Sequence, residues 1–123
     1  MELKPSVDEA STLKRFAFML HLREGAAEAY DQAHREVWPE MLQMLKRGGI
    51  REYSIFRRDQ QLFLYMQVAN FQHVLSCMAA SEVNLRWQKT MEPLFEPVPG
   101  KRPDEPFAMM TEVFHLVEDS SPD

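Results

Sequence analysis

The apolar residues of this chain follow two periods in turn, and the order of these periods limits the folds that the chain can adopt. Alternation of apolar and polar residues predicts strands, because successive strand side chains face opposite sides of a sheet. Apolar residues spaced three and four apart predict helices. The strands are expected at 14–22, 50–57, 62–68 and 108–116, and the helical stretches at 25–47 and 71–95.

Local signals mark the ends of these elements. Gly48 and Gly49 are expected to stop the first helical stretch, and the polar residues 58–61 to form the turn of a hairpin. Ser81 is a candidate N-cap that restarts a helix within the second stretch. Pro39 removes a helical hydrogen bond, so the first stretch is expected to kink or restart there.

The resulting order, βαββαβ, predicts an α+β domain of the ferredoxin-like type. We expect a single domain over residues 13–117, with flexible tails at 1–12 and 118–123, the second of them acidic. A sheet of this type has helices on one face only, so its other face needs a cover. A second copy packed sheet to sheet is the economical cover, and it predicts a homodimer.

Composition narrows the possible partners and the compartment. The chain has 123 residues, with 14 Lys and Arg against 19 Asp and Glu, and a net charge of −5. The basic residues are dispersed among acids, which argues against nucleic-acid binding. No apolar run approaches the roughly 20 residues that cross a bilayer, the N-terminus does not resemble a secretory signal, and the single cysteine, Cys77, forms no disulfide framework. A cytoplasmic protein without membrane contact is expected.

His34 is the residue best suited to carry chemistry. In a helix drawn through residues 30–45 it lies on the apolar face between Tyr30 and Leu45, where it is the one strongly polar residue aimed at the sheet. It could be a core histidine that hydrogen-bonds a backbone carbonyl. It could instead line a pocket as a proton donor or acceptor, since the reference pKa of imidazole, about 6.5, is near neutral.

Aromatic residues with polar groups suggest what such a pocket would bind. Tyr30 lies one turn before His34, Tyr53 lies on the second strand, and Trp87 lies on the second helical stretch. Each could serve ordinary packing, but together with His34 they favour a sugar-type pocket, where aromatic faces cover C–H groups and polar groups bind hydroxyls. The histidines show no metal-ligand spacing and no nucleotide-binding loop is present, so we expect no metal and no cofactor.

Several of these residues belong to a recognisable pattern. Tyr-x-x-x-His-x-x-x-Trp-Pro-Glu at 30–40, Gly-Ile-Arg-Glu-Tyr-Ser-Ile-Phe at 49–56, Leu-Phe-Leu-Tyr at 62–65, Arg-Trp at 86–87 and Glu-Val-Phe at 112–114 together resemble the L-rhamnose mutarotase family. The resemblance covers nearly all of the predicted domain, from 14 to 116. It implies a dimeric ferredoxin-like α/β-barrel that interconverts the α and β anomers of a 6-deoxy sugar, a monosaccharide, without a cofactor.

The resemblance also implies roles for single residues. His34 matches the family's proton donor, Tyr30 and Tyr53 match its substrate-binding tyrosines, and Trp87 matches the first residue of a Trp-Trp pair at the sugar site. The second position of that pair is Gln88 here. An amide exchanges stacking for hydrogen bonding, so this departure bears on which sugar is preferred more than on the type of reaction.

Two other functions fit the same fold. Dimeric α/β-barrels also host cofactor-free monooxygenases and other isomerases, and a non-catalytic dimeric module could bind a small molecule with His34 merely packed. The proline-rich stretch 97–106 could be a surface connector or a lid over the pocket.

Overall fold

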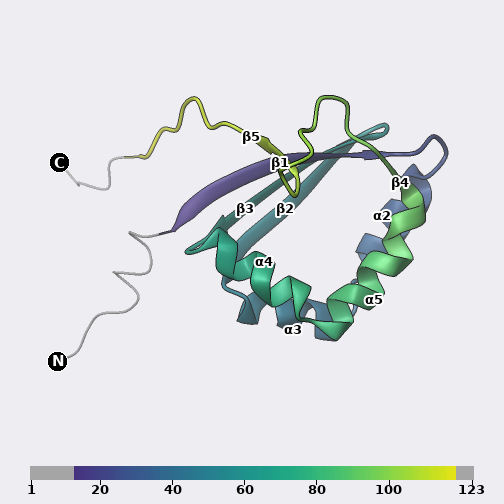
Figure 1. Cartoon of the computed structure of the whole chain (residues 1–123), viewed down its shortest axis with the longest axis horizontal. Helices are drawn as coiled ribbons and strands as arrows, with labels where there is room; N and C mark the ends of the chain where they lie inside the picture. Colours follow the sequence, from purple (N-terminus) through teal and green to yellow (C-terminus); the bar gives the residue numbers. More distant parts are fainter. Residues whose placement is uncertain (1–12, 119–123) are drawn as a thin grey trace.

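The computed structural model describes residues 13–118, which form a curled antiparallel sheet with helices packed against one face (Figure 1). The tail predicted at 1–12 lies outside the described residues, and so does the tail at 118–123 apart from Glu118, which is exposed and has no regular structure. No helix in the described range has the length and apolar character needed to cross a membrane.

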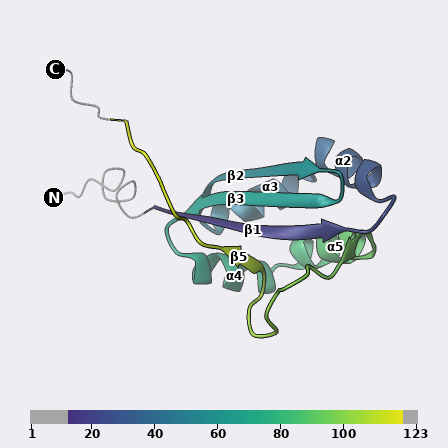
Figure 2. The same ribbon diagram turned by 90° about the horizontal axis from the view of Figure 1, so that it is seen from above.

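The elements follow the predicted order, with both helical stretches divided in two. They are β1 (Lys14–Leu22), α2 (Ala27–Arg35), α3 (Pro39–Arg47), β2 (Ile50–Arg58), β3 (Gln61–Val68), α4 (Phe71–Ala79), α5 (Glu82–Met91), the 3-10 turn η1 (Glu92–Leu94), β4 (Phe95–Glu96) and β5 (Ala108–Met110). The strand order is β2-β3-β1-β4, and β5 also pairs with β1 (Figure 2). This arrangement confirms the ferredoxin-like α+β fold.

The face of the sheet toward the helices forms most of the core. In β3 the alternate residues Leu62, Leu64, Met66 and Val68 are all at most 3% exposed, whereas the residues between them point to the other face. Antiparallel pairing places Phe18 of β1 opposite Leu64, so the alternation predicted from sequence is in register across the sheet. The predicted hairpin of β2 and β3 is confirmed, with its turn at Arg58–Gln61.

Pro39 divides the first helical stretch. Helix α2 ends at Arg35, and α3 begins at Pro39 as its first residue, where the missing backbone N–H costs no helical hydrogen bond. Trp38 has an extended conformation, with ψ of 135°, as expected for a residue before proline. Of the two outcomes predicted at Pro39, a kink or a restart, the structure shows the restart.

The second helical stretch restarts at Ser81, as predicted. The Ser81 side chain accepts a hydrogen bond from the backbone N–H of Asn84 at 3.1 Å, which caps α5. Asn70 caps α4 in the same way through the N–H of His73. The two caps fix where α4 and α5 begin beneath the sheet.

The strand expected at 108–116 is wrong beyond Met110. Of this stretch, Ala108–Met110 pair with β1, and residues 111–118 have no ladder partner within 13–118. Val113 and Phe114 are 91% and 79% exposed. Alternation describes a strand only where a neighbouring backbone receives its hydrogen bonds. The segment after Met110 is joined to β1 by side chains instead, because Arg15 of β1 donates two hydrogen bonds to the Glu112 carboxylate.

An ion pair ties α2 to the sheet. Arg57 at the end of β2 donates to both carboxylate oxygens of Asp31, at 2.8 and 2.6 Å. The hydrogen bonds from Arg57 hold the pKa of Asp31 below its ordinary value. Asp31 directly follows Tyr30, so the pair anchors the helix that carries Tyr30 and His34.

Replacement of Asp31 with Asn should therefore lower stability in a pH-dependent way. Because the folded-state pKa is depressed, the stabilisation is present above the unfolded carboxyl pKa of about 3.9 and is lost as the pH falls through the folded-state value. Urea unfolding should give a lower midpoint for Asp31→Asn than for wild type at pH 7, with the difference shrinking in acid. A difference that stays constant down to the lowest pH at which the protein folds would contradict this account.

Candidate active site

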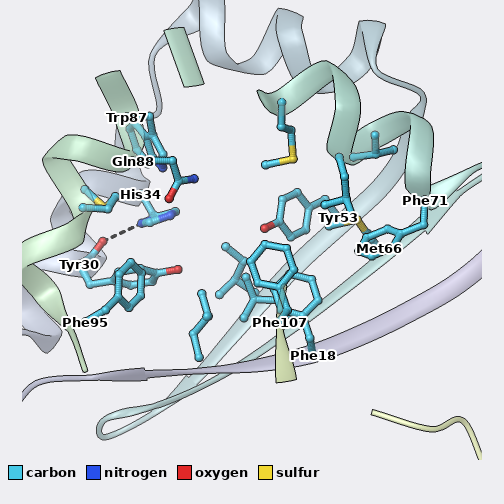
Figure 3. Close-up of a pocket in the computed structure, with 17 residues that line it drawn as sticks. Phe18, Tyr30, His34, Tyr53, Met66, Phe71, Trp87, Gln88, Phe95 and Phe107 are labelled. Atoms are coloured by element: carbon cyan, nitrogen blue, oxygen red, sulfur yellow. Dashed lines mark hydrogen bonds between the residues drawn. The ribbon is translucent and has the colours of Figure 1, made fainter. Parts of the chain in front are cut away.

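A cavity of about 250 Å³ lies between the inner face of the sheet and the helices α2, α4 and α5 (Figure 3). Its wall is largely apolar and includes Phe18, Leu64, Met66, Val74 and Met91. The polar side chains on the wall are those of Tyr30, His34, Tyr53 and Gln88, together with the indole of Trp87. The structure thus brings all five site residues predicted from sequence to one cavity; their roles remain predictions.

The His34 ring is held in one orientation at the side of the cavity. Its Nδ1 lies 2.9 Å from the backbone carbonyl oxygen of Tyr30. Because a carbonyl oxygen only accepts, Nδ1 must carry the proton of this hydrogen bond. The opposite edge of the ring, with Nε2, faces the cavity (Figure 3). His34 therefore combines both expected environments: one nitrogen satisfied by a carbonyl, the other available to a ligand.

Aromatic contacts on both sides fix the position of the imidazole. The ring of Tyr30 lies 4.1 Å from it between centroids, and Trp87 meets it edge to face at 5.3 Å. Trp38 meets Trp87 in turn, edge to face at 5.1 Å. His34 can thus present Nε2 in a single direction.

The Trp-Pro-Glu sequence has a structural explanation in the same place. The Arg86 guanidinium lies 5.5 Å from the Trp38 ring centroid and 3.5 Å from the Glu40 carboxylate. These contacts join the junction of α2 and α3 to α5. The motif does not line the cavity. It supports the position of His34 indirectly, because Trp38 contacts Trp87 and Trp87 contacts the His34 ring.

The two tyrosines contribute neutral hydroxyls from different elements. Tyr30 comes from α2 and Tyr53 from β2, and both hydroxyls point toward the middle of the cavity (Figure 3). Burial raises the pKa of Tyr53 to about 12 and raises that of Tyr30 further above its ordinary value, with Tyr53 and Asp31 adding to the effect. Both phenols therefore stay protonated near neutral pH and can donate hydrogen bonds to a ligand.

Gln88 lies where two cavities meet. A second cavity of about 240 Å³ shares His34, Tyr53, Trp87 and Gln88 with the first and extends along α3, where its wall is apolar. That further wall consists of Val37, Met41, Leu42 and Leu45. The polar groups are thus gathered at the junction, with apolar space on either side.

Sequence reasoning missed part of the wall. Phe107, which directly follows the proline-rich stretch, stacks on Phe18 at 4.4 Å and lines the cavity, as does Phe95. No residue of 97–106 lies on this wall, so the lid remains untested. Nothing local in the sequence marks Phe107, because its position depends on the pairing of β5 with β1. Among residues 13–118, no group of three or more His, Cys, Asp or Glu could hold a metal ion.

Comparisons with known proteins agree on one family. The sequence model of the family described as L-rhamnose mutarotase matches residues 15–116. An L-rhamnose mutarotase of Oceanobacillus iheyensis is 34% identical over 107 residues, covering 85% of this chain and 99% of the relative. One of Bacillus subtilis is 36% identical over 86 residues, covering 68% of this chain and 82% of the relative.

Solved structures support the same assignment. A crystal structure of an L-rhamnose mutarotase from Formosa agariphila superposes with a TM-score of 0.68 at 30% identity, covering 85% of this chain and 99% of that one. Tetracenomycin F2 cyclase from Streptomyces glaucescens superposes with a TM-score of 0.55 at 13% identity, covering 86% and 99%. The likeness to the cyclase shows the fold alone.

The curled sheet, the helices on one face and the cavity beneath define a ferredoxin-like α/β-barrel protein with a small-molecule site. The chain belongs to the L-rhamnose mutarotase family, which confirms the resemblance seen in its motifs. It is accordingly an isomerase, a sugar mutarotase.

The burial of Tyr30 and Tyr53 leads to a direct spectroscopic prediction. The chain has three tyrosines, and two of them should ionise only well above the ordinary phenol range, because burial disfavours the phenolate. A titration followed by ultraviolet absorbance should lose one high-pH step in Tyr30→Phe and another in Tyr53→Phe. If either variant instead loses a step near pH 10, that tyrosine is not buried as described.

Proposed function

We propose that the protein interconverts the α and β anomers of L-rhamnose or a related 6-deoxy sugar, with His34 as the acid and base. The observation that carries the assignment to His34 is its geometry: Nδ1 is bound to the Tyr30 carbonyl, and Nε2 faces a cavity of about 250 Å³. Relatives named L-rhamnose mutarotase supply the substrate class.

The cavity suits a monosaccharide in size and in chemistry. Pockets for drug-sized ligands measure roughly 300–1,000 Å³, so this cavity is matched to something smaller. The hydroxyls of Tyr30 and Tyr53 and the amide of Gln88 can hydrogen-bond sugar hydroxyls. The aromatic and aliphatic wall can cover the C–H face of the ring and a C6 methyl group, and Trp87 is part of that wall.

The reaction can be written with proton transfers alone. Protonated His34 gives the Nε2 proton to the ring oxygen as the C1–O5 bond breaks, while water takes the proton of the anomeric hydroxyl, leaving an open-chain aldehyde. Rotation about C1–C2 and attack of the O5 hydroxyl on the other carbonyl face closes the ring, with the protons returned in reverse. Neutral Tyr30 and Tyr53 orient the sugar hydroxyls. Proton transfer needs no redox, nucleotide or metal group.

This function explains the comparisons better than its rivals do. The relatives described above, all at 30% identity or more, are L-rhamnose mutarotases by name, and they favour neither a monooxygenase nor a non-catalytic binding module. We also infer a cytoplasmic location, which is supported by the free thiol of Cys77, the single cysteine of the sequence.

We further propose that two copies pack sheet to sheet. The helices cover one face of the sheet and leave the other open in residues 13–118 (Figures 1 and 2). Phe56 and Phe63 lie opposite one another on the open face and are 61% and 38% exposed, beside Met110 at 44%. A patch of large apolar side chains spread across the open face of a sheet needs a partner, and two-fold symmetry lets the same patch serve both copies.

The catalytic proposal is tested by saturation transfer between the anomeric protons of L-rhamnose, with L-fucose as a second sugar. Wild type should accelerate exchange, and His34→Ala should lose about 10²- to 10⁴-fold of that acceleration, the usual contribution of general acid–base catalysis. His73→Ala, which removes an exposed histidine on α4, is the matched control and should behave as wild type. No protein-dependent exchange with any sugar would overturn the function; wild-type exchange in His34→Ala would overturn the residue assignment alone.

The dimer proposal is tested by light scattering after gel filtration. Phe63→Asp places a charge in the open face and should convert a dimer into a monomer. Leu85→Asp, at a position 58% exposed on α5, is the control on the helical side and should leave the mass unchanged. A monomeric wild type would rule out the sheet-to-sheet pair.

A further inference from the structure

Asn84 is a buried polar residue whose bonds lead directly to the cavity. It lies on α5, is 5% exposed, and is the one buried polar or charged residue within the described part of the chain. Its side-chain amide donates from Nδ2 to the backbone carbonyl of Met78, in the last turn of α4, at 3.0 Å. A buried amide is retained at a cost unless its hydrogen bonds are made, so the remaining bonds of Asn84 call for an explanation.

The orientation of the Asn84 amide follows from its partner. The carbonyl of Met78 can only accept, so Nδ2 must face it, and Oδ1 must face the other way. Oδ1 in turn can only accept, and Nε2 of Gln88 lies 3.4 Å from it. Gln88 is one turn further along α5, so this hydrogen bond joins two residues of the same helix.

This chain of bonds sets the direction of the Gln88 amide. With Nε2 turned toward Asn84, the oxygen Oε1 is left for the cavity. Figure 3 shows the Gln88 amide pointing into the cavity with its oxygen on the side of His34. Without Asn84, the Gln88 amide could rotate by a half-turn about its last side-chain bond and present either its NH2 group or its oxygen to the cavity.

We propose that Asn84 is a positioning residue that fixes Gln88 as a hydrogen-bond acceptor for a sugar hydroxyl near the ring oxygen that His34 protonates. This inference rests on the proposed function and names a specificity determinant of the same site. Because Oε1 can only accept, the site selects a substrate that presents a donor at that position and discriminates against an analogue lacking the hydroxyl.

The position of Gln88 lets it influence how the sugar lies in both cavities. Gln88 lies on the walls of both cavities, at the point where they meet. An acceptor fixed there orients the sugar relative to His34, and it leaves the apolar space along α3 for carbon rather than hydroxyl groups. The amide pair thus links a structural bond between α4 and α5 to the choice of substrate.

A double-mutant cycle on Asn84 and Gln88 tests the proposal. Polarimetry of freshly dissolved L-rhamnose gives kcat and KM for wild type, Asn84→Leu, Gln88→Met and the double variant. Each single variant should raise KM by about 2- to 10-fold, the loss of one neutral hydrogen bond, with kcat changed less than about twofold. The double variant should be no worse than the poorer single variant, because both remove the same acceptor.

Ser81→Ala is the matched control for a purely structural effect. It removes the cap of α5, the bond from the backbone N–H of Asn84 to the Ser81 hydroxyl, at a cost of about 1 kcal/mol to stability. The side-chain amides of Asn84 and Gln88 both stay in place. The melting temperature of this variant should fall while its KM stays that of wild type. A KM that rises in Ser81→Ala as in Asn84→Leu would make the effect one of helix stability and overturn the positioning role, as would single effects that multiply in the double variant.

A second measurement needs neither activity nor the folding of Asn84→Leu. In 15N-labelled protein, the side-chain NH2 signals of Gln88 are those that disappear in Gln88→Met. Their hydrogens should exchange with water more slowly than those of Gln72, which is exposed as Gln88 is but makes no side-chain hydrogen bond within residues 13–118. Exchange as fast as that of Gln72 would overturn the bond to Asn84, and this result is independent of whether any sugar is turned over.

Discussion

The inner face of the sheet must bury the apolar sides of the helices and still leave room for a small molecule. The two demands conflict, since protein interiors are close-packed. The structure meets both: the inner-face side chains of β3 are buried, and α2 and α5 face them with large aromatic and polar side chains that leave a cavity. Everything proposed about function depends on this gap in the packing.

The break between α2 and α3 affects how His34 is oriented in this cavity. A continuous helix through residue 38 would require Trp38 in the conformation that Pro39 disfavours. Because the helix restarts, Trp38 turns back against Trp87, and Trp87 braces the edge of the His34 ring. A backbone constraint set by one proline is thus transmitted through two indoles to the orientation of the imidazole.

Local signals predicted most of the fold, and they failed where a distant partner decides. The alternation in β1, β2 and β3 and the cap at Ser81 were sufficient, because each depends on neighbours in the sequence. The segment after Met110 alternates just as well, yet it has no backbone partner in the described chain. The candidate site shows the same division: the helical phase placed His34 toward the sheet, but nothing local could place Phe107 on the wall or direct the Asn84 amide to the Met78 carbonyl of α4.

The sequence by itself determined the order of the elements, the face on which Tyr30 and His34 lie and, through its motifs, the family. Periodicity and turn chemistry act over a few residues and can be read in order along the chain. Only the tertiary structure decided which nitrogen of His34 faces the cavity, which way the Gln88 amide turns, and which aromatic rings close the wall. The hydrogen bonds that orient His34 and Gln88 are local, each within one helix, but the cavity that their free atoms face forms only when α2 and α5 pack on the sheet. The rings that close the wall come from elements far apart in sequence.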